Sequence, residues 1–342
     1  MISLYHQHEL ETFRKEHGID PFHLRRLFYR HFIDSVAAAK ALQELPVQHR
    51  ESVAANVRFH ELRLQERQDS DVDGATKILF QTHQGARLET VILRAPNRRV
   101  SVCVSSQVGC AAGCRFCATT LIPQVTNLSC GEIVDQIVQA NQQLTVEQKR
   151  IRNVVFMGMG EPLHNFEQVA AALELCHHQH ALGLAARRTV VSTVGIPEAM
   201  IAFAERFTRV PLALSLHSTD QVTREKLIPL AKKYHLTELR RAVKEVNRLQ
   251  RQPVLIEYLM LDSVNDSLTD ADHLANYLND LQVMVNLIPY NPIPARPDLQ
   301  PTPRDRRDAF AMRLREQGLT VTIRYSQGTD IDAACGQLAG QT

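Results

Sequence analysis

Three cysteines stand close together in the chain, in the order Cys-x3-Cys-x2-Cys: Cys110, Cys114 and Cys117. They follow an apolar, β-branched run at 100–104, which predicts a strand. Three thiolates this close can wrap one soft metal centre. Since the loop contains no fourth cysteine, they would hold three irons of a 4Fe-4S cluster and leave one iron open. An open iron can bind a substrate, so this loop predicts metal-centred chemistry.

A structural zinc site is the alternative interpretation of the same loop. Its fourth ligand would come from elsewhere, with His177, His178 and His180 as candidates. Structural zinc sites usually consist of two ligand pairs, whereas this chain has one triplet without a matching pair, so the spacing favours the cluster. The spacing also resembles that of radical S-adenosylmethionine (SAM) enzymes, which implies that the methionine moiety of SAM binds the open iron.

Composition excludes several classes of protein. The 39 basic and 37 acidic residues nearly cancel to a net charge of +2, which is too small to predict nucleic-acid binding. Trp is absent and aromatic residues are 6% of the chain, so RNA, if it binds, must be recognised mainly by shape and charge. Seven cysteines without a signal peptide or a membrane-spanning apolar run predict a reducing cytoplasm and no membrane.

The chain divides into three predicted parts. Residues 1–70 contain short helices at 9–17, 22–33 and 47–56, which predict a small helical accessory domain of the kind that binds RNA. Residues 71–100 form a linker with a β-hairpin, because two alternating runs at 76–82 and 87–93 flank Gln84-Gly85. Residues 101–342 form the main domain, which ends in a segment with a further cysteine, Cys335.

In the main domain, apolar strand-like runs alternate with helical stretches. The predicted strands are 100–105, 151–157, 188–192, 210–215, 254–260 and 283–288, with a further strand at 320–324. The predicted helices are 130–144, 166–179, 197–206, 237–249, 270–281 and 304–317. This alternation predicts an α/β fold with a parallel sheet, as a partial (βα)6 barrel. A flat doubly wound sheet is the alternative.

Polar motifs follow successive predicted strands, at the sheet edge where such folds gather reactive groups. Gly160 and Glu161 follow the second strand, and their flexible backbone and carboxylate suit the ammonium end of SAM. Ser192, Ser215, His217 and Asn291 follow later strands and are candidates for ribose and carboxylate contacts, although each is also a common turn or capping residue. Phe116 either stacks on the adenine or packs the loop.

Five ordered motifs carry a resemblance to a known family. They span 103–110 (CVSSQVGC), 158–163 (GMGEPL), 215–217 (SLH), 286–292 (NLIPYNP) and 330–338 (DIDAACGQL). Together they resemble the RlmN/Cfr family of radical SAM RNA methyltransferases, from about residue 73 to residue 338.

The resemblance implies a mechanism that uses two SAM molecules. The first methylates Cys335, and the second is cleaved reductively at the 4Fe-4S cluster held by Cys110, Cys114 and Cys117. The radical that forms takes a hydrogen from the methyl group, and the resulting carbon radical adds to an adenine ring. Cys103 then attacks the Cys335 sulfur and releases the methylated base, leaving a disulfide for a cellular reductant. An sp² carbon of adenine is a poor nucleophile, which is why a radical carries this step.

The resemblance also assigns the remaining site residues. Glu89 matches the family's proton acceptor, although the alternating pattern equally allows a solvent-facing hairpin residue. The cofactor contacts implied are Gly160, Glu161, Ser192, Ser215, Leu216, His217 and Asn291. The chain departs from the family at Thr120, where a glycine is usual, and at Thr126, where an arginine is usual.

The function implied is methylation of carbon 2 of an adenine in 23S ribosomal RNA, with tRNA as a further candidate substrate. A Cfr-like reaction at carbon 8 and a different radical SAM enzyme are the alternatives, and a non-enzymatic RNA-binding protein with structural zinc is a third class. We expect a monomer that receives electrons from a donor such as flavodoxin or ferredoxin.

Overall fold

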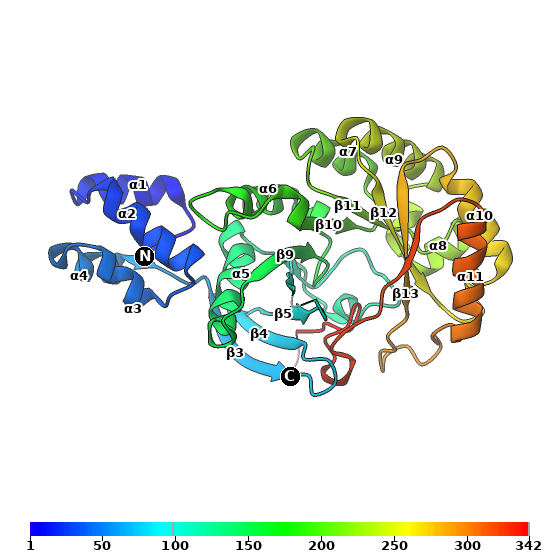
Figure 1. Cartoon of the computed structure of the whole chain (residues 1–342), viewed down its shortest axis with the longest axis horizontal. Helices are drawn as coiled ribbons and strands as arrows, with labels where there is room; N and C mark the ends of the chain where they lie inside the picture. The colour runs from blue at the N-terminus through cyan, green and yellow to red at the C-terminus, as the bar shows by residue number, and fades with distance from the viewer. Residues whose placement is uncertain (98, 341–342) are drawn as a thin grey trace.

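The computed structural model describes residues 1–97 and 99–340, and its centre is one ten-stranded sheet (Figure 1). The strand order is β14-β13-β12-β11-β10-β9-β6-β5-β4-β3. The bounds are β3 Leu62–Asp69, β4 Thr76–Thr82, β5 Arg87–Arg94, β6 Val100–Cys103, β9 Ile151–Phe156, β10 Thr189–Thr193, β11 Leu212–Ser215, β12 Val254–Met260, β13 Val283–Pro289 and β14 Val321–Ile323. In this sheet, β6 and the strands from β9 to β14 pair in parallel, whereas β3, β4, β5 and the β5 side of β6 pair in antiparallel fashion.

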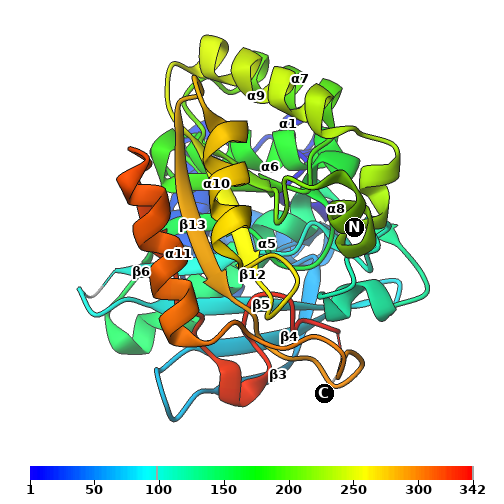
Figure 2. The same ribbon diagram turned by 90° about the vertical axis from the view of Figure 1, so that its right-hand side faces the viewer.

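Seven helices connect the parallel strands. They are α5 Cys130–Leu144, α6 Phe166–His177, α7 Pro197–Arg206, α8 Gln221–Leu227, α9 Leu236–Gln250, α10 Leu268–Leu278 and α11 Arg304–Glu316. The parallel strands are neighbours in chain order, and right-handed crossovers therefore carry every helix to the same face. Figure 2 shows α7, α9, α10 and α11 wrapped around the outside of the sheet. A doubly wound sheet would reverse its strand order, so the partial barrel is confirmed.

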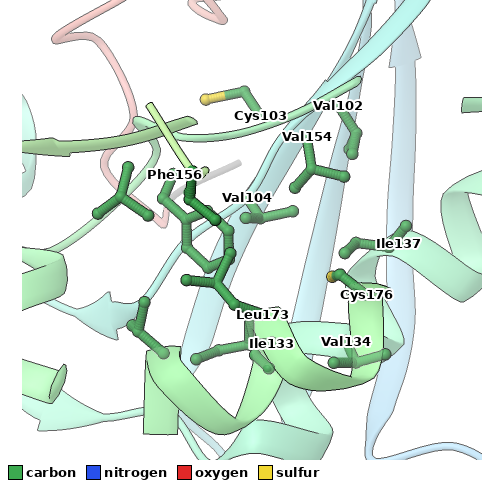
Figure 3. Close-up of a cluster of buried hydrophobic side chains, with 14 of the residues drawn as sticks. Val102, Cys103, Val104, Ile133, Val134, Ile137, Val154, Phe156, Leu173 and Cys176 are labelled. Carbon is green, nitrogen blue, oxygen red and sulfur yellow. The ribbon is translucent and has the colours of Figure 1, made fainter. Parts of the chain in front are cut away.

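The core between β6, β9, α5 and α6 follows from strand alternation. Val102 and Val104 project toward the two helices, where they pack with Ile137 and Cys176 (Figure 3). Cys103, between the two valines, faces the opposite side of the sheet. The same alternation that builds the core therefore places one thiol on the inner face.

The N-terminal helices lie at one end of the molecule (Figure 1). Their bounds are α1 Gln7–Glu16, α2 Pro21–Phe28, α3 Ala38–Ala41 and α4 Val47–Asn56. The α-helix expected at 22–33 ends at Phe28, and the chain continues from there as a π-helical turn, Tyr29–Ile33. Strand β3 lies inside the stretch expected to be helical and pairs with β4 in the main sheet. The division of the chain at residues 70 and 100 stays a prediction.

Asp135, on α5, joins the N-terminal helices to the barrel. Its carboxylate is fully buried and accepts hydrogen bonds from the Tyr5 hydroxyl at 2.6 Å and the His60 ring at 2.8 Å. It also accepts from the backbone N–H groups of Glu61 at 2.8 Å and Leu62 at 2.9 Å. Burial alone would raise the pKa of Asp135, but these partners outweigh burial and hold the pKa below its ordinary value.

Replacing Asp135 by Ala is therefore expected to lower the free energy of unfolding by about 3 kcal/mol or more, because several buried donors lose their acceptor. In the wild type, the stabilisation from the ionised carboxylate is complete above the ordinary Asp pKa of about 4 and is lost as the pH falls further. Denaturant titration of both proteins from pH 3 to pH 7 measures both effects. A difference in stability that stays constant over this range would contradict the assignment.

No helix within the described residues has both the length and the apolar character needed to cross a membrane.

Candidate active site

A pocket opens at the carboxyl ends of the parallel strands, with an empty volume of about 1020 Å³ that includes its solvent-filled mouth. The residues singled out from the sequence that line it are Cys110, Cys114, Cys117, Phe116, Gly160, Glu161, Ser192, Ser215, His217 and Cys335. The pocket thus gathers side chains from the carboxyl ends of four parallel strands, β6, β9, β10 and β11, or from the loops that follow them, and from the C-terminal segment, which we define as residues 326–340.

The cysteine loop is held by backbone hydrogen bonds to α8 and to the turn that follows α8. Arg115 donates its backbone N–H to the Leu227 carbonyl at 2.9 Å, and Leu230 donates to the Ala112 carbonyl at 3.3 Å. Thr120, where the family has glycine, donates its hydroxyl to the carbonyls of Cys114 and Cys117 at 3.1 and 2.8 Å. The departure at this position therefore adds bonds to the loop.

The three thiols line one pocket, but they do not meet at one point. Among residues 1–97 and 99–340, no three His, Cys, Asp or Glu side chains are close enough to share a single metal ion. In a 4Fe-4S cluster each cysteine binds a different iron, so thiols spread around a pocket fit a cluster better than one zinc ion. His177, His178 and His180 are not among the pocket's lining residues, and His177 contacts Thr189 at 2.9 Å.

Burial raises the pKa of all three thiols, to about 12 for Cys110. The cysteines are therefore protonated when no metal is bound. Metal binding would displace these protons, because thiolates rather than thiols are the ligands. When bound, the cluster would supply an electron at its open iron, and SAM bound there would be the molecule cleaved.

Glu161 lines the pocket and is buried. One carboxylate oxygen accepts the Leu163 N–H at 3.0 Å, and the other accepts the Val194 N–H at 2.8 Å. Burial raises the pKa of Glu161, while these two N–H groups oppose the shift. Each oxygen keeps a second lone pair, so the carboxylate can still accept a hydrogen bond from an ammonium group in the pocket.

Gly158 and Gly160 are required by packing within the protein rather than by a ligand alone. Gly160 has φ of +98°, and a Cβ atom there would lie 2.6 Å from Cβ of Gln107. A Cβ on Gly158 would lie 2.7 Å from the Val104 carbonyl oxygen. The two glycines therefore let the turn after β9 press against the end of β6, which brings Glu161 beside the cysteine loop.

His217 presents one defined proton to the pocket. Its Nδ1 atom accepts the Leu259 N–H at 3.0 Å, so the neutral ring carries its proton on Nε2. Burial and the positive charge of Arg224 lower the pKa of His217 to about 3, which keeps the ring neutral at physiological pH. Phe116 packs its ring edge-on against this histidine at a centroid distance of 4.9 Å, so it both packs the loop and lines the pocket.

One buried carboxylate oxygen in the pocket has no hydrogen-bond partner among residues 1–97 and 99–340. Glu257, on β12, accepts a hydrogen bond from Asn286 on Oε1 at 3.0 Å, while Oε2 is buried without any hydrogen bond. Such an orphaned acceptor is costly unless a ligand donates to it. This oxygen and the unspent lone pairs of Glu161 fit a ligand rich in donors, as the ammonium, hydroxyl and amino groups of SAM are.

Cys335 lies between two cavities. It lines the main pocket, and it also lines a second cavity of about 1300 Å³ together with Cys103 and Arg324. Burial and the neighbouring Cys335 raise the pKa of Cys103 to about 12, whereas Arg324 favours its thiolate form. Cys103 and Cys335, which are 232 positions apart in the chain, therefore lie close together as free thiols.

The C-terminal segment is fixed where it passes the cysteine loop. Ala118 donates its N–H to the Gly336 carbonyl at 2.7 Å, and the Thr119 hydroxyl donates to the Leu338 carbonyl at 2.7 Å. Asn291, predicted as a cofactor contact, does not line the main pocket; it donates to the Cys335 carbonyl at 3.0 Å. In this structure, Asn291 therefore positions the cysteine.

Two further predicted residues lie outside the main pocket. Leu216 is buried in the core, and its carbonyl accepts a hydrogen bond from Arg224 at 3.1 Å. Glu89 is buried on the inner face of β5 rather than exposed on the hairpin, so the solvent-facing alternative is wrong. Its Oε2 atom accepts the N–H groups of Ala339 at 2.8 Å and Gly340 at 3.0 Å.

Sequence reasoning missed Arg224 and Arg324. Arg224 belongs to α8, a short helix that was not predicted, and it ties the loops after β10 and β11 together by donating to the Val194 and Leu216 carbonyls. Arg324 directly follows β14, so its place at the carboxyl end of a parallel strand was the signal that could have identified it.

Comparison with known proteins agrees with this geometry. The family model of the Radical SAM superfamily matches residues 104–275 of this chain. A "Probable RNA methyltransferase" of Rhodopirellula baltica is 46% identical over 99% of this chain and 88% of its own length. A "Probable dual-specificity RNA methyltransferase RlmN" of Bacillus pumilus is 38% identical over 98% of this chain and 93% of its own.

A solved structure, that of a radical SAM methyltransferase from Sphaerobacter thermophilus, superposes with a TM-score of 0.95 at 36% identity and covers 100% of both chains. The chain therefore belongs to the radical SAM superfamily and, within it, to the RlmN/Cfr family of methyltransferases, and it is an enzyme.

Proposed function

We propose that the chain is an RNA methyltransferase that adds a methyl group to carbon 2 of an adenine in 23S ribosomal RNA, through S-methylcysteine at Cys335. The names of its relatives support RNA as the substrate, and "dual-specificity" in several of those names is consistent with a second RNA substrate, for which we propose tRNA. The observation that carries the proposal is the place of Cys335. It lines the pocket of the three cysteines and, on its other side, the cavity that contains Cys103.

The residues of the pocket have two roles, binding the cluster and binding SAM. Cys110, Cys114 and Cys117 would hold the cluster, and Glu161, Ser192, Ser215, His217 and Glu257 would hold SAM. When bound together, these cofactors would supply a radical that removes one hydrogen atom from the methyl group on Cys335. The chain keeps that group beside the pocket through Asn291 and through the backbone bonds of 336 and 338 to the cysteine loop.

Cys103 and Glu89 would complete the reaction after the methylene carbon has bonded to the adenine. Glu89 accepts the proton from the ring carbon, and the electron pair of that C–H bond stays in the ring. Cys103 attacks the Cys335 sulfur, so that an S–S bond forms and the S–CH₂ bond breaks. The electron pair of the broken S–CH₂ bond moves to the carbon, which takes up a proton to become the methyl group. Forming the disulfide releases two electrons, and cleaving one SAM to methionine and 5′-deoxyadenosine consumes two, so the electron supplied at the start is returned.

Anaerobic reaction of the reconstituted protein with SAM and unmodified 23S RNA tests the function. Mass spectrometry of the digested RNA is expected to detect 2-methyladenosine. Only 8-methyladenosine would refute the carbon 2 assignment in favour of the Cfr-like reaction, and no methylated adenosine would refute an adenine methyltransferase. A flavodoxin or ferredoxin as electron donor, a monomeric state and a cytoplasmic location stay predictions.

A further inference from the structure

Lys77 and Glu89 form a buried ion pair between neighbouring strands. The Lys77 Nζ atom lies 3.5 Å from Glu89 Oε1, and the two side chains are 8% and 2% exposed. In the antiparallel register, Lys77 faces Val91 and Glu89 faces Leu79, so the two charges are diagonal neighbours on one sheet face. Val91 in turn faces Cys103 on β6, and alternation therefore places Lys77, Glu89 and Cys103 on the same face.

A lysine at this position is costly for the fold. Leu79, on the same face of β4, and Val91, opposite Lys77 on β5, are buried and apolar. Removing an ammonium group from water costs several kcal/mol, and one ion pair rarely returns more than that cost. An apolar residue would therefore stabilise the hairpin at least as well. This indicates that the charge of Lys77 stabilises the Glu89 carboxylate rather than the sheet.

Glu89 has different partners on its two carboxylate oxygens. Lys77 contacts Oε1, while the N–H groups of Ala339 and Gly340 occupy Oε2. Burial raises the pKa of Glu89, and the Gly340 N–H, Lys77 and the Ala339 N–H oppose that shift. The neighbouring Ser105 and Met159 bind the backbone of Glu89 and are uncharged, so among the described residues Lys77 is the charged group that stabilises this carboxylate.

The two N–H groups cannot both stay bonded when Oε2 accepts a proton. A protonated oxygen donates its own hydrogen and keeps one lone pair, so it can accept from only one N–H group. Proton transfer to Oε2 therefore requires at least one of the bonds from Ala339 and Gly340 to open. Lys77 then provides a larger share of the interactions that oppose the cost of burying the negative charge.

We propose that Lys77 is a positioning residue for the methylation reaction: it holds Glu89 as an anion on the inner face of the sheet when a bond from residue 339 or 340 to the carboxylate opens. This inference rests on the proposed function, in which Glu89 takes the ring proton of the Cys335–RNA adduct. Without Lys77, Glu89 is protonated over a wider pH range and takes that proton slowly. The adduct, a covalent bond between the protein and the RNA, then persists.

The test compares Lys77→Met, which keeps the length of the side chain without its charge, with Lys77→Arg, which keeps the charge. At pH 7, K77M is expected to form methylated adenosine about tenfold more slowly than wild type and to accumulate protein–RNA adduct on denaturing gels. The acidic limb of its pH–rate profile should move upward by about one pH unit, because an opposite charge lowers a carboxyl pKa by that much or more. K77R should restore both readouts to within about threefold of wild type.

A purely structural role would lower the thermal unfolding midpoint of K77M without moving its pH profile or raising the adduct fraction, and that result would overturn the inference. If K77M does not fold, Lys77→Gln takes its place, and a wild-type profile in K77Q has the same meaning. Infrared titration of the Glu89 carboxyl band, identified by its loss in Glu89→Gln, needs no RNA. A higher titration midpoint in K77M than in wild type supports the ion pair's role, and equal midpoints contradict it. Failure of the wild type to methylate RNA would instead refute the proposed function.

Discussion

Replacement of Cys335 by Ala is expected to reduce RNA methylation to below about one thousandth of the wild-type rate, because the nucleophile that carries the methyl carbon is gone. The fold should survive, since Cys335 is only partly buried and its carbonyl, which Asn291 binds, remains. Quantifying methyladenosine by mass spectrometry measures the loss. Cys130→Ala is the matched control, because Cys130 is another partly buried free cysteine, placed outside both cavities.

Replacement of Cys103 by Ala should stop the same reaction at a later stage. The thiol that breaks the S–CH₂ bond is missing in this variant, so the protein should remain bonded to the RNA through Cys335. A denaturing gel should therefore detect a stable protein–RNA adduct in Cys103→Ala and none in Cys335→Ala. Undiminished turnover by Cys335→Ala would rule out the methylcysteine route and leave another type of radical SAM enzyme.

The second large effect is expected when Cys110, Cys114 and Cys117 are replaced together by Ala. The variant should lose its iron and its visible absorbance and should release no 5′-deoxyadenosine from SAM, because three thiolates are the ligands that the loop offers. The loop itself should persist, since it is fixed by backbone bonds to Leu227 and Leu230 rather than by the thiols. Iron analysis and the absorbance spectrum after anaerobic reconstitution measure the effect, again with Cys130→Ala as the control. Iron retained by the triple variant would place the cluster elsewhere.

The alternating strands and helices of the barrel could be predicted because their signals are local. Strand β12 and helices α5 and α7 have the predicted bounds, since apolar periodicity and turn residues mark both ends of each. Strand β3 was missed because its exposed, charged residues lack an alternating apolar pattern; pairing with β4 determines its structure. The short helix α8 gave too little periodicity to be predicted.

The candidate site, too, could be predicted from the sequence only in part. Glu161 follows β9, and Ser192 and Ser215 lie at the carboxyl ends of β10 and β11, so their convergence in one pocket follows from a strand order that could be predicted. The path of the C-terminal segment could not be predicted, because its contacts join residues more than two hundred positions apart without any periodic pattern. The bond from Asn291 to Cys335 likewise has no periodic signal, and the alternating pattern of the hairpin left open whether Glu89 is exposed or buried beside Lys77.

The central claim is that the three cysteines hold a 4Fe-4S cluster with one iron open to SAM. Iron and acid-labile sulfide analysis of the wild-type protein, purified without oxygen and reconstituted, tests this claim most directly. We predict about four irons and four sulfides per chain. A polypeptide that binds neither iron nor sulfide under these conditions, or that binds zinc instead, would contradict the account.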